Sequence, residues 1–181
     1  QIRFVSLIFS GALALAAPLA APAQDKPRPG GELVFVVPAE PPSFDAHREE
    51  TFAMLHPGAP HYSTLIRVDP NDRTGTKFIG DLALSWTGSP DRRTQTFKIR
   101  SGVEFHGGGT VTADDVVATL KRHTDENAQS GALGIVQGIS EMTAEGDTVT
   151  LKLASANADL PFLIADYHLI IQPGGGIDNP A

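Results

Sequence analysis

Apolar and polar positions alternate most regularly in two stretches of the chain. In residues 94–100, Phe97 and Ile99 alternate with threonine and lysine, and residues 148–153 repeat this pattern with valine and leucine. A period of two is typical of a strand with one buried face. Each stretch has a short partner next to it in sequence, so the pattern predicts two β-hairpins. The paired segments are residues 82–86 with 94–100 and residues 139–144 with 148–153.

Residues 112–123 carry the signals of a short amphipathic helix. Thr112 is suited to cap the helix, aspartates follow in the first turn, and basic residues stand in the last turn, where the helix dipole favours them. Val116, Val117 and Leu120 form one apolar stripe. We therefore expect a helix that lies on a sheet.

Two apolar runs predict buried strands. The first spans residues 32–37, between a Gly-Gly pair and Pro38, and the second spans residues 169–171. In residues 51–66 the apolar positions are irregular and prolines interrupt them, so we expect only short helical pieces there. Residues 157–165 predict a short helix with Pro161 in its first turn.

The order of these elements indicates the fold class. Strands and helices are mixed, but they do not follow the strict strand–helix–strand rhythm of a parallel sheet. The pattern therefore predicts an α/β protein of the mixed α+β kind.

The N-terminus has the three parts of a secretory signal peptide. Arg3 precedes an uncharged apolar run from residue 4 to residue 17, and small residues follow up to Ala23. The run is short for a membrane span, which needs about 20 residues, so a membrane anchor or a buried helix is the weaker alternative. We expect residues 1–23 to be a cleavable signal peptide and the proline-rich residues 24–30 to be a linker. Because the chain has no cysteine that could carry a lipid, a soluble periplasmic protein is predicted.

Composition excludes several classes of function. The formal net charge is −7 and the basic residues are scattered, which argues against a nucleic-acid partner. With no cysteine, the chain has neither a disulfide framework nor a thiolate metal site.

Motifs for catalysis or cofactor binding are also missing from the sequence. There is no His-Glu-x-x-His, no acidic calcium loop and no Gly-x-Ser-x-Gly, and the triple glycines at 107–109 and 174–176 lack the Lys-Ser/Thr of a phosphate loop. We interpret the glycines as turns and His47, His56 and His61 as surface or cleft-edge residues. No catalytic residue, metal or cofactor is predicted.

The best candidates for ligand contact follow the first predicted strand. The segment that contains Glu50, Thr51, Phe52 and Met54 comes after a proline-rich turn and has no clean periodicity. Loops at strand ends are where a rigid sheet tends to hold binding groups. Trp86 and Phe97, by contrast, lie within strand patterns and are expected in the core.

Several strings, taken in order, resemble the peptide/nickel-type extracellular solute-binding proteins, family 5. The turn after the first predicted strand, an Asp-Leu-Ala start followed by Ser-Trp, and a long block around His106 follow the family's order and spacing. A departure occurs at Gly107-Gly108, where family members commonly have Asp-Gly. The strings are GGELV (30–34), PAEPPSFD (38–45), DPN (69–71), DLALSW (81–86), TFKIRSGVEFH (96–106) and TADDVV (112–117).

The resemblance implies a two-lobed clamshell of the periplasmic-binding-protein type II fold, in which ligand binds between the lobes. Residues 31–181 would form an incomplete N-terminal lobe, and Glu50, Thr51 and Phe52, with Met54 beside them, would approach the ligand. The implied function is non-enzymatic capture of a small solute, with short peptides as the leading class, for an ABC permease and ATPase complex at the inner membrane. Alternatives are a nickel, sugar or opine binder on the same fold, an exported hydrolase, or an adaptor or sensor.

Overall fold

The computed structural model describes residues 29–176 of the chain. The chain divides into two units, Gln1–Phe35 and Val36–Ala181. The predicted signal peptide and most of the linker lie outside the described residues.

The apolar run at residues 32–37 is extended but does not form the predicted buried strand. Leu33, Val34 and Val36 are 81–94% exposed, and no segment among residues 29–176 pairs with the run. A strand is stabilised by a hydrogen-bonded neighbour and a covered face, and the described residues offer this run neither. The prediction of a buried strand is therefore wrong here.

Both predicted hairpins are confirmed, and together they form one antiparallel sheet of four strands in the order β3-β4-β6-β5. In β4 and β6 every second side chain is buried, as in Phe97, which lies opposite Trp86 on β3 and Val149 on β6. The other face carries threonines and ion pairs, so the sheet is covered on one side only. The strands are β3 (Ala83–Gly88), β4 (Thr94–Ile99), β5 (Ile139–Glu145) and β6 (Thr148–Leu153).

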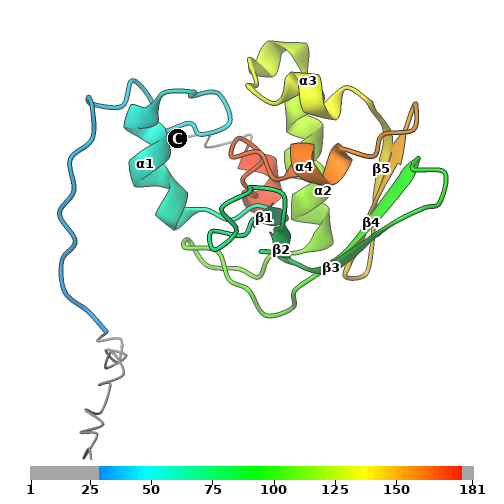
Figure 1. Cartoon of the computed structure of the whole chain (residues 1–181), viewed down its shortest axis with the longest axis horizontal. Coiled ribbons are helices and arrows are strands. Elements are labelled where there is room, and N and C mark those ends of the chain that lie inside the picture. Colours follow the sequence, from blue (N-terminus) through cyan, green and yellow to red (C-terminus); the bar gives the residue numbers. More distant parts are fainter. Residues whose placement is uncertain (1–28, 177–181) are drawn as a thin grey trace, which may run out of the picture. The chain divides into compact units, whose positions relative to one another are not determined.

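The predicted amphipathic helix is α2 (Ala113–Thr124), and it packs against β5 and β6 (Figure 1). Thr112 and Asp115 form a reciprocal capping box: the Thr112 hydroxyl accepts from the Asp115 amide at 3.2 Å, and the Asp115 carboxylate accepts from the Thr112 amide at 2.9 Å. Its apolar stripe is buried in the same core cluster as Phe97. The local signals in the sequence therefore placed both the start of this helix and its buried face.

Shorter elements surround this helix and sheet. The strands β1 and β2 form a small antiparallel pair. Residues 52–61 form two short helices, α1 and η1, as expected from the prolines in this stretch. Pro161 lies in the first turn of α4, also as expected. Their bounds are α1 (Phe52–Gly58), η1 (Ala59–His61), β1 (Ile66–Val68), β2 (Phe78–Gly80), η2 (Glu126–Ala128), α3 (Leu133–Val136), α4 (Leu160–Ile164) and η3 (Pro173–Gly176).

Residues 169–171 are buried, as predicted, but they form no strand. The Ile171 amide donates to the Ser63 carbonyl at 2.9 Å, and the Gln172 amide donates to the Thr119 hydroxyl at 3.2 Å. The segment thus satisfies its backbone with a loop and a helix side chain rather than with a β ladder. It leads into η3, which packs on α2.

Candidate functional site

The predicted ligand-binding residues lie at the start of α1. Glu50, Thr51 and Phe52 are exposed, whereas Met54 is buried. Thr51 is the N-cap residue, but its side chain makes no capping hydrogen bond. Three of the four side chains are therefore exposed at the entry to the helix, and the fourth is directed inward.

Phe52 is the most prominent apolar side chain of this group. Its ring is 66% exposed and stacks on the ring of His56 at a centroid distance of 5.3 Å. A large exposed aromatic with one ring neighbour retains most of its face for another contact. It does not belong to the core.

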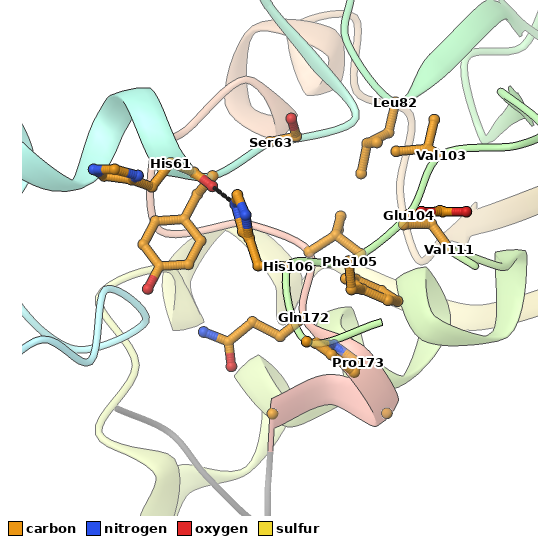
Figure 2. Close-up of a pocket in the computed structure, with 15 residues that line it drawn as sticks. His61, Ser63, Leu82, Val103, Glu104, Phe105, His106, Val111, Gln172 and Pro173 are labelled. Carbon is orange, nitrogen blue, oxygen red and sulfur yellow. Dashed lines mark hydrogen bonds between the residues drawn. The ribbon is translucent and has the colours of Figure 1, made fainter. Parts of the chain in front are cut away.

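The larger of two hollows that adjoin η1 has a volume of about 440 Å³ and is drawn in Figure 2. Its walls come from η1 and the residues after it, from the loop before α2, and from the segment that leads into η3. Most of the wall is apolar, with polar groups at a few points. The labelled lining residues are His61, Ser63, Leu82, Val103, Glu104, Phe105, His106, Val111, Gln172 and Pro173.

His106 joins two walls of this hollow. Its Nε2 lies 2.8 Å from the carbonyl oxygen of His61, and Figure 2 shows the ring pointing toward that backbone. Because a carbonyl only accepts, Nε2 must carry the hydrogen and donate it. The loop of Gly107–109 follows directly, as the turn that was predicted from its sequence.

A smaller hollow of about 260 Å³ lies behind α1. Met54 and Leu55 contribute to its apolar lining, and Arg67 and Asp81 add charged groups. Tyr62 lines both hollows. Of the four predicted residues, Met54 lines the smaller hollow, whereas Glu50, Thr51 and Phe52 are exposed and line neither of the two hollows.

Just before α1 in the chain, residues 45–47 belong to a buried polar cluster that sequence reasoning missed. Asp45, His47, Arg122 and His123 are all buried, although they come from segments about 75 residues apart. Arg122 pairs with Asp45 at 3.1 Å and also contacts His47, whose ring lies 4.4 Å from that of His123. The expectation that His47 is a surface or cleft-edge residue is therefore wrong.

Burial governs the protonation of these histidines. Loss of water lowers the pKa of His123 to about 3, with further lowering by His47 and Arg122. Burial also lowers the pKa of His47, and Arg122 acts in the same direction. Both rings are therefore neutral near neutral pH.

This shift predicts that acid destabilises the protein before its carboxylates titrate. A histidine whose pKa is lowered in the folded state takes up protons more readily when the protein is unfolded. The stability that its neutral ring gives to the folded protein is therefore complete above the unfolded pKa of 6.5 and decreases as pH falls toward the folded pKa of about 3. We expect the melting temperature of the intact protein to fall steadily between about pH 6.5 and pH 4.5, above the usual carboxylate range.

Thermal melts of a His123→Gln variant serve as the control for this prediction. The variant is less stable at neutral pH but has one fewer group that gains protons on unfolding, so its melting temperature should depend less steeply on pH. Equal slopes for the two proteins would contradict the assignment.

Two further observations bear on the class of the site. Within residues 29–176, no three His, Asp or Glu side chains are grouped so that they could hold a metal ion. Over the same part of the chain, no helix has the length and apolar character needed to cross a membrane.

Comparison with known proteins places this arrangement in a family. Residues 77–180 match the bacterial extracellular solute-binding proteins, family 5 Middle. The probable D,D-dipeptide-binding periplasmic protein DdpA of Escherichia coli (strain K12) is 30% identical over 129 residues, which cover 67% of this chain and 22% of DdpA. The chain spans about a fifth of the length of the curated relatives that it matches.

Solved structures agree with this match. The binding protein MoaA from A. tumefaciens R10, in complex with mannopinic acid, is 30% identical with a TM-score of 0.67, over 75% of this chain and 28% of MoaA. The dipeptide-binding protein of Pseudoalteromonas sp. SM9913, in complex with Met-Leu, is 26% identical with a TM-score of 0.65, over 75% of this chain and 30% of that protein. These likenesses confirm the predicted fold class, a mixed α/β part of a periplasmic binding protein.

DdpA and a second relative, a probable peptide ABC transporter protein of Sinorhizobium fredii, are both named as periplasmic binding proteins. The matched family segment covers more than half of the chain, from β2 to beyond η3. The chain therefore belongs to the bacterial extracellular solute-binding proteins of family 5.

Proposed function

We propose that this chain is part of the periplasmic substrate-binding component of an ABC importer, which captures a small solute and performs no chemistry on it. The observation that carries the proposal is the start of α1, where a carboxylate, a hydroxyl and an aromatic ring are exposed side by side in a family 5 protein. The proposal includes export by a cleavable signal peptide in residues 1–23 and docking to an ABC permease and ATPase complex.

Short peptides are the ligand class that we propose first. The Glu50 carboxylate suits an ammonium group, the Thr51 hydroxyl can donate to or accept from a peptide bond, and the Phe52 ring suits an apolar side chain. Relatives of this chain bear the names of dipeptide- and tripeptide-binding proteins. A ligand that also touches a second lobe would stabilise the closed form by hinge closure.

An opine is the second candidate. A solved protein that is 30% identical to this chain holds mannopinic acid. The exposed carboxylate and hydroxyl at the start of α1 could serve an opine's amine and hydroxyl groups equally well.

Isothermal titration calorimetry of the intact protein tests the proposal. Di- to pentapeptides, mannopinic acid and Ni²⁺ would be titrated separately. Heat of binding with peptides supports the first ligand class and heat with mannopinic acid the second. Absence of binding to all of them would overturn the proposed ligands, and release of product from a peptide or ester would overturn the non-enzymatic function.

Phe52→Ala is expected to weaken ligand binding without a large loss of stability. The ring is exposed, so its removal leaves the core intact, whereas loss of an aromatic anchor typically weakens binding by about tenfold or more. The affinity from calorimetry and the melting temperature would be measured together. Phe162→Ala, at a similarly exposed ring on α4, is the matched control and should keep the wild-type affinity. A loss of stability with unchanged affinity would show that Phe52 is a packing residue.

A further inference from the structure

The buried cluster of Asp45, His47, Arg122 and His123 holds the segment that leads into the predicted ligand-binding residues. Its members come from residues 45–48, from the C-terminal end of α2, and from residues 166–170. Three segments distant in sequence meet there, and Ser130, seven residues after His123, contacts the His123 ring at 2.5 Å.

Hydrogen bonding alone determines the protonation state of His47. The Arg122 Nη1 group can only donate, so the His47 Nδ1 that it meets must be an acceptor without a hydrogen. The other ring nitrogen, Nε2, then carries the hydrogen and donates to the Ile170 carbonyl oxygen at 2.8 Å. The geometry requires a neutral ring in a single tautomer.

The same cluster fixes the backbone just before α1. Arg122 Nη2 donates to one carboxylate oxygen of Asp45 at 3.1 Å, and the other oxygen accepts from the His47 amide at 3.1 Å. The Asp45 carbonyl accepts from the amides of Arg48 and Glu49 at 3.0 and 2.9 Å. The chain then continues directly to Glu50, Thr51 and Phe52.

We propose that Arg122, through its contacts with Asp45 and His47, is a positioning residue for the ligand-binding segment at residues 50–52. These contacts of Arg122 with Asp45 and His47 form a latch, and protonation of His47 releases it. The inference rests on the proposed function, because it assigns a regulation to the same site. A proton on Nδ1 removes the acceptor that Arg122 requires and places two cationic groups in direct contact.

The surroundings of His47 decide how the latch responds to acid. The Ile170 carbonyl and the Asp45 carboxylate favour a charged His47 ring, whereas the cationic Arg122 and the ring of His168 oppose it. Burial lowers the pKa of His47 first of all. The latch therefore stays closed near neutral pH, and its opening becomes easier as pH falls below about 6.5, the ordinary pKa of histidine.

His47→Gln separates the latch from a purely structural role. Glutamine has one amide group that can donate to the Ile170 carbonyl and one oxygen that can accept from Arg122, so it can preserve both contacts. It cannot be protonated in this pH range. Lys121→Gln removes an exposed charge from the residue next to Arg122 and is the matched control.

Hydrogen exchange of the intact protein without ligand is the first measurement. We expect the protection of amides in residues 46–56 to fall about tenfold or more between about pH 7.5 and pH 5 in the wild type and in Lys121→Gln, because the lost contacts favour local opening. In His47→Gln the fall should be at least about threefold smaller than in the wild type, because His123 is then the one remaining ring of this neighbouring pair that gains a proton on opening. An equal fall in all three proteins, or no fall in the wild type, would overturn the proposal.

Binding of Met-Leu and of mannopinic acid at the same two pH values is the second measurement. A wild-type affinity that weakens in acid, with a flat profile for His47→Gln, supports the positioning role, and parallel profiles overturn it. If neither probe binds the wild type while exchange responds as expected, the proposed ligands fail but the acid latch stands.

Discussion

Replacing Phe97 by alanine is expected to lower the free energy of unfolding of the intact protein by about 3–5 kcal/mol. The ring is fully buried on β4, which has neighbours on both sides, and it lies opposite Trp86 and Val149. A rigid sheet flanked in this way collapses poorly into the space left by a phenyl group, so the cavity cost adds to the lost transfer energy. Urea unfolding, with the midpoint and slope both fitted, measures the change.

Phe44→Ala is the matched control for this prediction, because it makes the same chemical change at a ring that is 57% exposed. We expect a loss within about 0.5 kcal/mol, as for most surface substitutions. Comparable losses for the two variants would mean that the β4 ring is not the packing centre that its burial indicates.

The elements that could be predicted from sequence are those whose signals are local. The amphipathic helix was evident because Thr112 and Asp115, three residues apart, contact each other directly in the capping box. The hairpins were evident because alternation, turn and partner strand all lie within about 20 residues of one another. Such contacts form between near neighbours, so a single stretch of sequence contains most of the information.

The two apolar runs show what local pattern leaves open. Residues 32–37 and 169–171 have similar composition, yet the first is exposed and the second is buried without being a strand. Whether an apolar run is covered or paired depends on segments far away in the sequence. The pattern within a run of three to six residues cannot indicate which distant segments will pack against it or pair with it. Composition there predicted a hydrophobic segment correctly and its structure wrongly.

The candidate site divides in the same way. Glu50, Thr51 and Phe52 were predicted to contact the ligand because they follow a proline-rich turn. The structure places them in an exposed position at the start of α1. The cluster of Asp45, His47 and Arg122 had no comparable signal, because its members are about 75 residues apart and each is a common surface residue. An aspartate two residues before a histidine was the sole local hint, and it is too frequent a pattern to indicate burial.

Arg122→Met is expected to destabilise the intact protein by about 3–5 kcal/mol, because it leaves a carboxylate buried without its cation. The side chains of Arg122 and Asp45 are only 7% and 6% exposed, so water cannot replace the lost partner without local opening. The variant also removes the donor to His47. Thermal melting and urea unfolding at about pH 7.5 measure the loss, and a change below about 1 kcal/mol would show that the pair is solvated in solution.

Adding Asp45→Asn to this variant tests whether the uncompensated charge causes the loss. The double variant buries no isolated carboxylate, so it should regain about 1 kcal/mol or more relative to Arg122→Met alone. Asparagine can still accept the His47 amide but cannot restore the contact between Arg122 and the His47 ring. Recovery of unfolding free energy without recovery of ligand affinity would therefore separate the stabilising role of the ion pair from the positioning role of Arg122.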